Sequence, residues 1–293
     1  MGTRLHGLLQ SRQGLIVAVC LICFIVFLKQ TVHGVELEWD TYKKSGHTNK
    51  KWNEHVRQGF EVYIKWSDAQ QANKKSEMEK YFKEAAGYLE DAYKKGCRDG
   101  MVLYRLGNVY RNMGYCDRAA LYLKEALPSL AKNYKEHYYH QLAYYGLGYC
   151  TKDDTEAVKH YRKAIELKPD DVNSRLNIAN RLRKMNRLDE SEKEVLVVLE
   201  DYAEKLNPYG AGVAYNNLGW IAYKRKQFSK AINLFTQALN IRGHVDDAEG
   251  LAWTYEAIGD KSKAKEYWKF VLHSVPQGSK KEELARKKLK LLQ

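Results

Sequence analysis

The stretch Gly212–Gly243, GVAYNNLGWIAYKRKQFSKAINLFTQALNIRG, predicts two amphipathic helices joined by a short turn at residues 226–229. Small and apolar residues recur at helical spacing in each half; they are Tyr215, Leu218, Gly219 and Ala222, then Ala231, Phe235 and Ala238. Because Gly219 and Ala231 are small, we expect the two helix backbones to approach closely at this pair, with Phe235 beside it. One such hairpin cannot bury its apolar face alone. A fold can therefore be predicted from this hairpin only if the pattern recurs along the chain.

The pattern recurs along most of the chain. The small residue near the start of each expected second helix appears as Ala85, Ala119, Ala157, Ser191, Ala231 and Ala264, in steps of 34, 38, 34, 40 and 33 residues. Loop residues at 128–137 and 206–210 account for the two longer steps. A near-constant period of this length indicates a tandem array of helical hairpins.

These hairpins resemble the tetratricopeptide repeat (TPR), a helix–turn–helix of about 34 residues with the pattern W-x2-L-G-x2-Y…A-x3-F…P. The match in the opening stretch is Tyr215-x2-Leu218-Gly219 and Ala231-x3-Phe235-x2-Ala238, with Gly243 in place of the final Pro. The segment Leu103-x2-Leu106-Gly107-x2-Tyr110 matches most closely, whereas Gln141-x2-Tyr144-Tyr145 lacks the small residue. Pro169 and Pro276 take the closing position, where a residue without an N–H stops a helix.

The resemblance covers residues 53–278 and implies an all-α, right-handed superhelical array of antiparallel helix pairs, a TPR solenoid. We expect repeats at 53–99 (degenerate), 100–133, 138–171, 172–205, 212–244 and 245–278. Residues 279–293 are expected to form the capping helix that shields the last apolar face. Residues 30–52 are expected to form a polar tether.

The amino-terminal residues 1–29 contain an unbroken apolar run at 15–28, LIVAVCLICFIVFL, between Arg12 and Lys29. As a helix this run spans about 21 Å, short of a hydrocarbon layer of about 30 Å, and snorkelling of Arg12 and Lys29 covers part of the deficit. We interpret residues 1–29 as a signal-anchor, a single-pass transmembrane helix, because Lys29 and the bulky residues before it fit a cleavage site poorly. A cleaved secretory signal is the alternative. The positive charges before the run favour a cytoplasmic amino terminus and an exported body.

The chain has 49 Lys and Arg against 36 Asp and Glu, a net charge of +13. Such a balance suits anionic lipid, acidic protein segments or nucleic acid as partners, and equally suits Lys-rich solvated helix faces, which we favour. Nucleic acid is the least favoured partner. No catalytic constellation, phosphate-binding loop or metal-ligand motif is present, so we expect no enzyme activity and no cofactor. The odd, irregular spacing of Cys97, Cys116 and Cys150 indicates free thiols.

The resemblance implies that the first helices line a concave groove that binds partners. Asparagines there both donate to and accept from a peptide backbone, arginine and lysine suit carboxylates, and tryptophans suit apolar side chains. The expected groove residues are Tyr104, Asn108, Arg111, Asn112, Asn173, Asn177, Asn180, Arg183, Lys184, Asn216, Trp220, Tyr223 and Trp253. For any one of them, an ordinary place on a solvated helix face is the alternative.

The sequence therefore predicts a membrane-tethered adaptor that captures a peptide or partner segment in the groove. One alternative is an exported soluble protein with the same role. The other assigns binding of anionic lipid or nucleic acid to the basic segments 43–83 and 280–290, with the repeats as scaffold.

Overall fold

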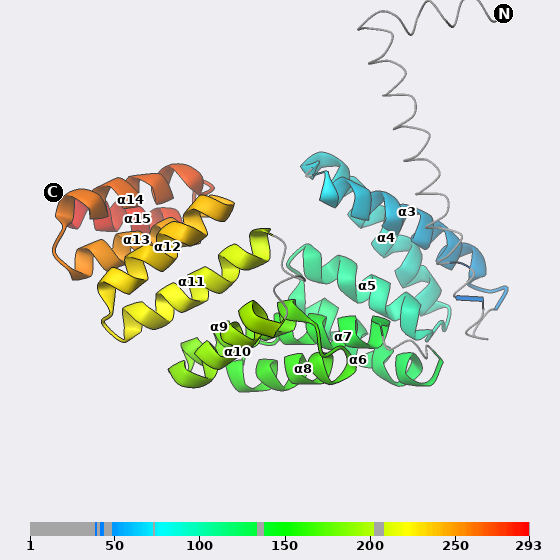
Figure 1. Ribbon diagram of the computed structural model, residues 1–293. Helices are drawn as coiled ribbons and strands as arrows, with labels where there is room; N and C mark the ends of the chain where they lie inside the picture. Colours follow the sequence, from blue (N-terminus) through cyan, green and yellow to red (C-terminus); the bar gives the residue numbers. More distant parts are fainter. Residues whose placement is uncertain are drawn as a thin grey trace, which may run out of the picture. The chain divides into compact units, whose positions relative to one another are not determined.

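The computed structural model describes residues 39, 42–43, 49–72, 74–133, 138–201 and 208–292, and all regular structure within these ranges is helical. The helices follow one another as hairpins (Figure 1). In chain order they are α3 (Asn53–Gln71), α4 (Lys75–Lys94), α5 (Gly100–Asn112), α6 (Cys116–Asn133), α7 (Tyr138–Cys150), α8 (Asp154–Leu167), α9 (Val172–Lys184), α10 (Leu188–Asp201), α11 (Pro208–Lys224), α12 (Phe228–Arg242), α13 (Val245–Ala257), α14 (Lys261–Ser274) and α15 (Lys280–Leu291).

The chain forms two compact units that divide between Gly146 and Leu147, within α7. In unit 1, which ends at Gly146, α3 packs on α4 and α5 packs on α6. In unit 2, which begins at Leu147, α9 packs on α10, α11 on α12 and α13 on α14. First helices of neighbouring pairs also touch, α3 with α5 in unit 1 and α11 with both α9 and α13 in unit 2. The expected all-α fold of stacked helix pairs is thus confirmed within each unit.

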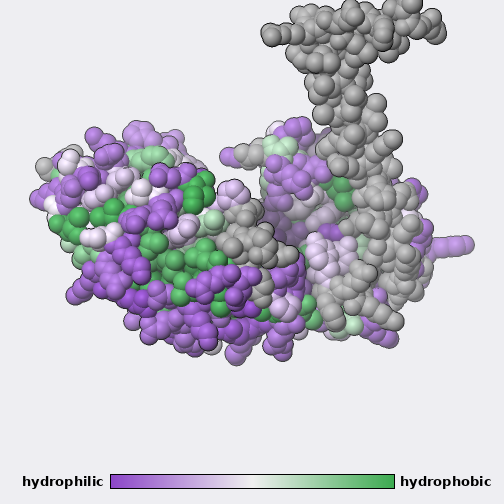
Figure 2. Space-filling view, in the orientation of Figure 1, coloured by the Kyte–Doolittle hydropathy of each residue, from purple (hydrophilic) through white to green (hydrophobic). Residues whose placement is uncertain are grey.

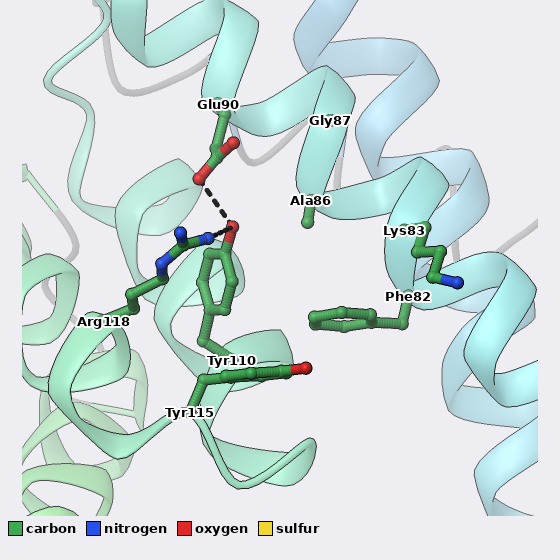
Figure 3. A pocket seen from close by; sticks show the side chains of 8 residues that line it. All are labelled: Phe82, Lys83, Ala86, Gly87, Glu90, Tyr110, Tyr115 and Arg118. Carbon is green, nitrogen blue, oxygen red and sulfur yellow. Dashed lines mark hydrogen bonds between the residues drawn. The ribbon is translucent and has the colours of Figure 1, made fainter.

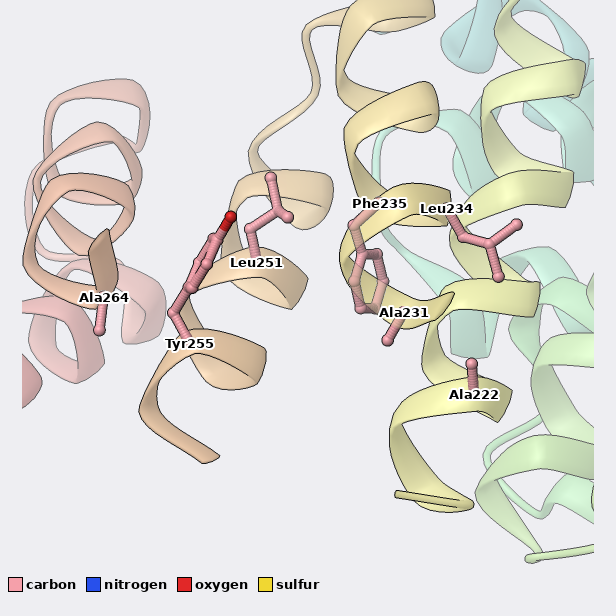
Figure 4. Packing of buried hydrophobic residues seen from close by; sticks show 7 residues of the cluster. All are labelled: Ala222, Ala231, Leu234, Phe235, Leu251, Tyr255 and Ala264. Atoms are coloured by element: carbon pink, nitrogen blue, oxygen red, sulfur yellow. The ribbon is translucent and has the colours of Figure 1, made fainter. Parts of the chain in front are cut away.

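The recurring small residues lie where the helices of a pair pack together. Ala85, Ala119, Ala157, Ser191, Ala231 and Ala264 are all fully buried. The one hydroxyl among them, of Ser191, donates to the backbone oxygen of Ala179 at 2.7 Å, so this polar side chain is buried without losing its hydrogen bond. Figure 4 shows the core around two of the alanines, with Phe235 of α12 facing Leu251 and Tyr255 of α13.

Short polar and left-handed residues set the helix ends. Asp153 accepts a hydrogen bond from the Glu156 backbone N–H at 2.8 Å and so caps the start of α8. Gly114 and Gly259 have positive φ in the turns after α5 and α13. The helix α8 ends at Leu167, two residues before Pro169. Proline has no backbone N–H to donate, so the helix does not continue through it.

Two local expectations were wrong. The helix α6 continues through Pro128 to Asn133, so the expected loop begins later. The helix α11 begins at Pro208, where a missing N–H costs nothing in a first turn. The Phe235 ring packs on Gly219, as expected: a Cβ at Gly219 would come within 2.8 Å of ring atoms Cδ1 and Cε1.

The expected signal-anchor at 15–28 and most of the expected tether at 30–52 lie outside the described residues. From Trp39 onward, across the ranges that are described, none of the helices has the combination of length and apolar character that a membrane crossing requires.

Candidate functional site

In unit 1, the predicted groove residues of α5 hydrogen-bond to one another. Asn108 Oδ1 accepts from Arg111 Nη2 at 2.7 Å and from Asn112 Nδ2 at 3.0 Å, and Asn108 Nδ2 donates to the Tyr63 hydroxyl at 2.7 Å. Asn112 Oδ1 in turn accepts from Gln70 of α3 at 3.0 Å. The structure therefore brings Asn108, Arg111 and Asn112 together, but as an internal network that joins α3 to α5.

A buried arginine beside this network was missed from the sequence. Arg105 stacks on the rings of Tyr63, Tyr104 and Tyr139, with its Cζ 4.5, 5.4 and 5.0 Å from the ring centroids. It also donates to the hydroxyls of Tyr63 and Tyr139, and burial lowers its pKa. Tyr104, predicted to line the groove, is only 5% exposed and belongs to this packed cluster. A charged residue inside an apolar helix face was the only sequence signal for Arg105.

In unit 2, one row of polar side chains on α9 keeps groups that make no hydrogen bond to any described residue, whereas Arg175 and Arg181 of the same helix pair with Glu194 and Asp154. Asn173, Asn177, Asn180 and Lys184 follow one another at spacings of 4, 3 and 4 residues and so share one side of the helix. Within the described residues, Asn177 Oδ1, Asn180 Nδ2 and both polar atoms of the Asn173 side chain make no hydrogen bond. Asn177 Nδ2 donates to the Asn173 backbone oxygen at 2.9 Å. This row retains both donors and acceptors for a ligand.

Arg183 lies beside this row, against an aromatic residue of the next pair. Its Nη2 donates to Asn180 Oδ1 at 2.7 Å, and its Cζ lies 5.6 Å from the centroid of the Trp220 ring. Its Nε is enclosed without an acceptor, and burial lowers the pKa of the guanidinium. No carboxylate of the described residues pairs with Arg183. An arginine remains charged at neutral pH despite such a shift, so unit 2 holds an uncompensated positive charge here.

The aromatic side of this site comes from α11. The Trp220 ring packs edge-on against Tyr223 at 5.6 Å and Phe235 at 5.2 Å between centroids. Burial is the main cause of the raised Tyr223 pKa. In Figure 2 hydrophobic side chains gather over α11, and hydrophilic ones over the neighbouring α9 and α10. We call this set the α9–α11 face; it consists of Asn173, Asn177, Asn180, Arg183, Lys184, Trp220 and Tyr223.

Two other predicted groove residues are engaged within the chain. Asn216 donates to Asp247 Oδ1 at 2.6 Å, and Asp247 forms a buried ion pair with Arg242 at 2.7 Å. The Trp253 ring is covered by Lys288 of α15, whose Nζ lies 3.7 Å from the ring centroid. The role of Trp253 in receiving a partner side chain stays a prediction; the sequence did not show that Lys288 of the last helix lies over this ring.

The basic segments are partly neutralised. In α15, Lys281 pairs with Asp246 and Glu249, Arg286 with Glu282, and Lys288 with Glu256. In the segment 43–83, Lys83 pairs with Glu79 on the helix surface. These pairings reduce the charge available to a lipid or nucleic-acid surface.

Unit 1 also has a pocket of about 420 Å³ between α4, the end of α5 and the start of α6 (Figure 3). The Phe82 and Tyr115 rings are parallel within 10° at 5.8 Å between centroids. Beside them the Tyr110 hydroxyl donates to Glu90 at 2.6 Å and accepts from Arg118 at 3.2 Å. The pocket thus has aromatic walls, with Glu90 and Arg118 linked through the Tyr110 hydroxyl. Across the described ranges, no three His, Cys, Asp or Glu residues come together as metal ligands would.

Comparison with known proteins finds a family match for part of the chain. Three tetratricopeptide repeat models match the chain, at residues 102–138, 137–171 and 170–243. No sequence match to a curated protein was found.

Solved structures share the fold at low sequence identity. The APC/C hetero-tetramer Cut9–Hcn1 matches with a TM-score of 0.63 and 16% identity, over 89% of this chain and 47% of that one. PilW, described as a widely conserved type IV pilus biogenesis factor, matches with a TM-score of 0.55 and 17% identity, over 77% of this chain and 98% of that one. At such identity these likenesses concern the fold alone. The family models and the helical pairs agree: residues 102–243 of this chain are tetratricopeptide repeats.

Proposed function

We propose that this chain is a protein–protein interaction adaptor that captures an extended segment of a partner protein on the α9–α11 face. The observation that carries the proposal is the contrast between the two units. The groove asparagines of α5 are engaged in hydrogen bonds inside unit 1, whereas the row of asparagines on α9 keeps donors and acceptors that no described residue engages. A peptide backbone carries both N–H donors and carbonyl acceptors, and a row of asparagine side chains with open donors and acceptors can pair with both.

The dimensions of the row suit an extended peptide. Seven residues of helix separate Asn173 from Asn180, a rise of about 10 Å, and three residues of extended chain cover the same length at about 3.3 Å each. Trp220 of α11 lies beside Arg183 at the end of this row, and with Tyr223 it offers aromatic surface to a side chain of the same segment. The fold relative with the higher TM-score, Cut9–Hcn1, is itself an assembly of protein chains.

The proposal includes a membrane tether. The apolar run at 15–28 between Arg12 and Lys29 is proposed as a single-pass anchor, with the repeats on the exported side. The mass of the mature amino terminus tests this directly. An intact residue 1 in membrane fractions agrees with an anchor, while a start after residue 29 would establish a cleaved signal. Protease digestion of sealed vesicles then reports the side on which the repeats lie.

Affinity capture after crosslinking in membranes tests the adaptor role. The test variant combines Asn173→Ala, Asn177→Ala and Asn180→Ala in the full chain. The matched control combines Asn233→Ala and Asn240→Ala, two exposed asparagines on α12 of the same unit. We expect the wild type and the control to retain the same partner and the test variant to lose it. Retention of that partner by all three proteins would refute capture on the α9–α11 face.

A further inference from the structure

The pocket of unit 1 is walled by three aromatic rings (Figure 3). Phe82 of α4 stacks on Tyr115 and meets Tyr110 of α5 edge-on, at 5.7 Å between centroids. Phe82 and Tyr110 are buried, but Tyr115 is 54% exposed. A ring this open beside two buried ones leaves apolar surface that a group from outside the chain can cover.

Gly87 keeps the α4 wall of this pocket open. It lies inside the helix, four residues after Lys83 and three before Glu90, and all three residues line the pocket. A glycine inside a helix destabilises it relative to alanine. A Cβ at Gly107 would come within 2.7 Å of Leu123, whereas a Cβ at Gly87 would meet no atom within 4 Å. No described neighbour therefore requires glycine at this position, and its missing side chain adds space to the pocket.

Two side chains of opposite charge border the same pocket. Glu90 accepts from the Tyr110 hydroxyl through Oε1, and Arg118 donates to that hydroxyl through Nη1. Within the described residues, Glu90 Oε2 accepts no hydrogen bond, Arg118 Nη2 donates none, and neither side chain forms an ion pair. Arg118 repels a cationic ligand and Glu90 an anionic one. The pocket therefore favours a neutral ligand that both donates and accepts hydrogen bonds.

We infer that this pocket binds a tyrosine side chain of a partner protein. The ring packs against Phe82 and Tyr115 in the offset or edge-on geometry that aromatic rings prefer. Its hydroxyl is neutral at physiological pH and both donates and accepts, so it donates to Glu90 and accepts from Arg118, as the hydroxyl of Tyr110 already does. The volume of about 420 Å³ lies within the range of ligand pockets. The site belongs to unit 1 and goes beyond capture on the α9–α11 face.

Three peptides test the assignment: acetyl-Ser-Tyr-Ser-amide, acetyl-Ser-Phe-Ser-amide and acetyl-Ser-Leu-Ser-amide. Each is titrated into the full chain in phospholipid nanodiscs, with 4-fluorophenylalanine in place of phenylalanine. The ¹⁹F signal of Phe82, assigned from its absence in Phe82→Leu, reports binding at the pocket. We expect a saturable shift with the Tyr peptide and an affinity at least about twofold lower for the other two, the low end of what one hydrogen bond contributes. No shift with the Tyr peptide, or a smaller preference for it, would overturn the assignment.

Two leucine substitutions on α4 separate the pocket from the rest of the helix surface. Gly87→Leu places a side chain in the open space, whereas Glu84→Leu adds the same side chain at an exposed position that does not line the pocket. Leucine favours a helix more than glycine does and its Cβ meets no atom, so Gly87→Leu should keep its helix content. We expect Gly87→Leu to lose roughly tenfold or more in affinity for the Tyr peptide, and Glu84→Leu to bind as the wild type does. Equal affinities in both variants would overturn the site.

Arg118→Met tests the contact with the hydroxyl. Methionine keeps the apolar stem of the side chain and removes the donor. We expect the affinity for the Tyr peptide to fall about twofold or more, while the affinity for the Phe peptide stays unchanged. Equal losses for both peptides, or no loss for either, would overturn the assignment of tyrosine as the ligand.

Discussion

Phe235 of α12 fills the space that a side chain at Gly250 would need on the first helix of the next pair. A Cβ at Gly250 would come within 2.6 Å of ring atoms Cδ1 and Cζ, closer than any relaxed contact allows. A Cβ at Gly219, in the same pair as Phe235, would also come within 2.8 Å of Cδ1 of this ring. One aromatic ring thus joins two consecutive hairpins, and it can do so because both neighbours lack a side chain.

The contact predicts that Gly250→Ala destabilises the protein. Overpacking of a closed core costs about 1–3 kcal/mol, and here the ring and the α13 backbone must move apart. Gly87→Ala is the matched control, since a Cβ at this mid-helix position meets no atom within 4 Å. It should instead add about 0.5–1 kcal/mol, the cost of glycine inside a helix. Urea unfolding of both variants measures the two effects, and a stable Gly250→Ala protein would contradict the packing.

A lysine occupies a backbone conformation that suits glycine. Lys226, in the turn between α11 and α12, has φ of 59°, and the same turn position after α13 is Gly259, with φ of 83°. We expect Lys226→Gly to raise the free energy of unfolding by about 0.5–1 kcal/mol, because it removes left-handed strain. Gly259→Ala should lower it. Thermal unfolding of both variants measures these changes. A loss of stability in Lys226→Gly would show that the lysine side chain stabilises the turn.

Alkaline pH should unfold the protein through its tyrosines. Burial is the largest cause that raises the pKa of Tyr63, Tyr110 and Tyr122 from 10.0 to about 12. A folded-state pKa above the unfolded value means that the folded state holds the proton more tightly. Its contribution to stability is complete below the unfolded pKa and is lost as pH rises through about 12. Circular dichroism and phenolate absorbance followed together over this range should change in step; early titration without unfolding would contradict the burial.

Two arginines of unit 2 should respond differently to the same substitution. Arg242 is 5% exposed by side chain and pairs with the fully buried Asp247, so Arg242→Met leaves a buried carboxylate alone and costs about 3–5 kcal/mol. Arg183 pairs with no carboxylate of the described chain, so Arg183→Met loses only a hydrogen bond and a ring contact, about 1 kcal/mol or less, and removes a desolvated charge. Urea unfolding of the Arg242→Met and Arg183→Met variants compares the two losses in stability. A large loss in Arg183→Met would assign Arg183 to the fold and not to a ligand.

Much of the fold follows from local pattern, because helical hairpins depend on residues close in sequence. The buried series from Ala85 to Ala264 could be read from spacing alone, since each member meets its partner helix within one repeat. Contacts between individual side chains were harder to predict from the sequence. The Phe235 ring reaches both Gly219 and Gly250, because long side chains on a helix extend beyond their own backbone position.

The candidate site shows where sequence reasoning stops. Helical spacing places Asn108 and Asn177 on corresponding first helices, yet it does not show which of them is already bonded. Asn108 is engaged by Tyr63, 45 residues earlier, and Asn216 by Asp247, 31 residues later. Such contacts between repeats depend on how consecutive hairpins stack. The selection of the α9–α11 face among the thirteen predicted residues therefore required coordinates.

Site-specific photocrosslinking tests the adaptor role most directly. A photoreactive phenylalanine analogue is placed at Asn177 in the full chain in its native membranes, and at Asn240 on α12 as the control. Both positions lie in unit 2 on helices of adjoining pairs. The account predicts one defined crosslinked protein product from position 177 that is absent from position 240. Identical products from both positions, or a product from position 240 alone, would contradict capture on the α9–α11 face.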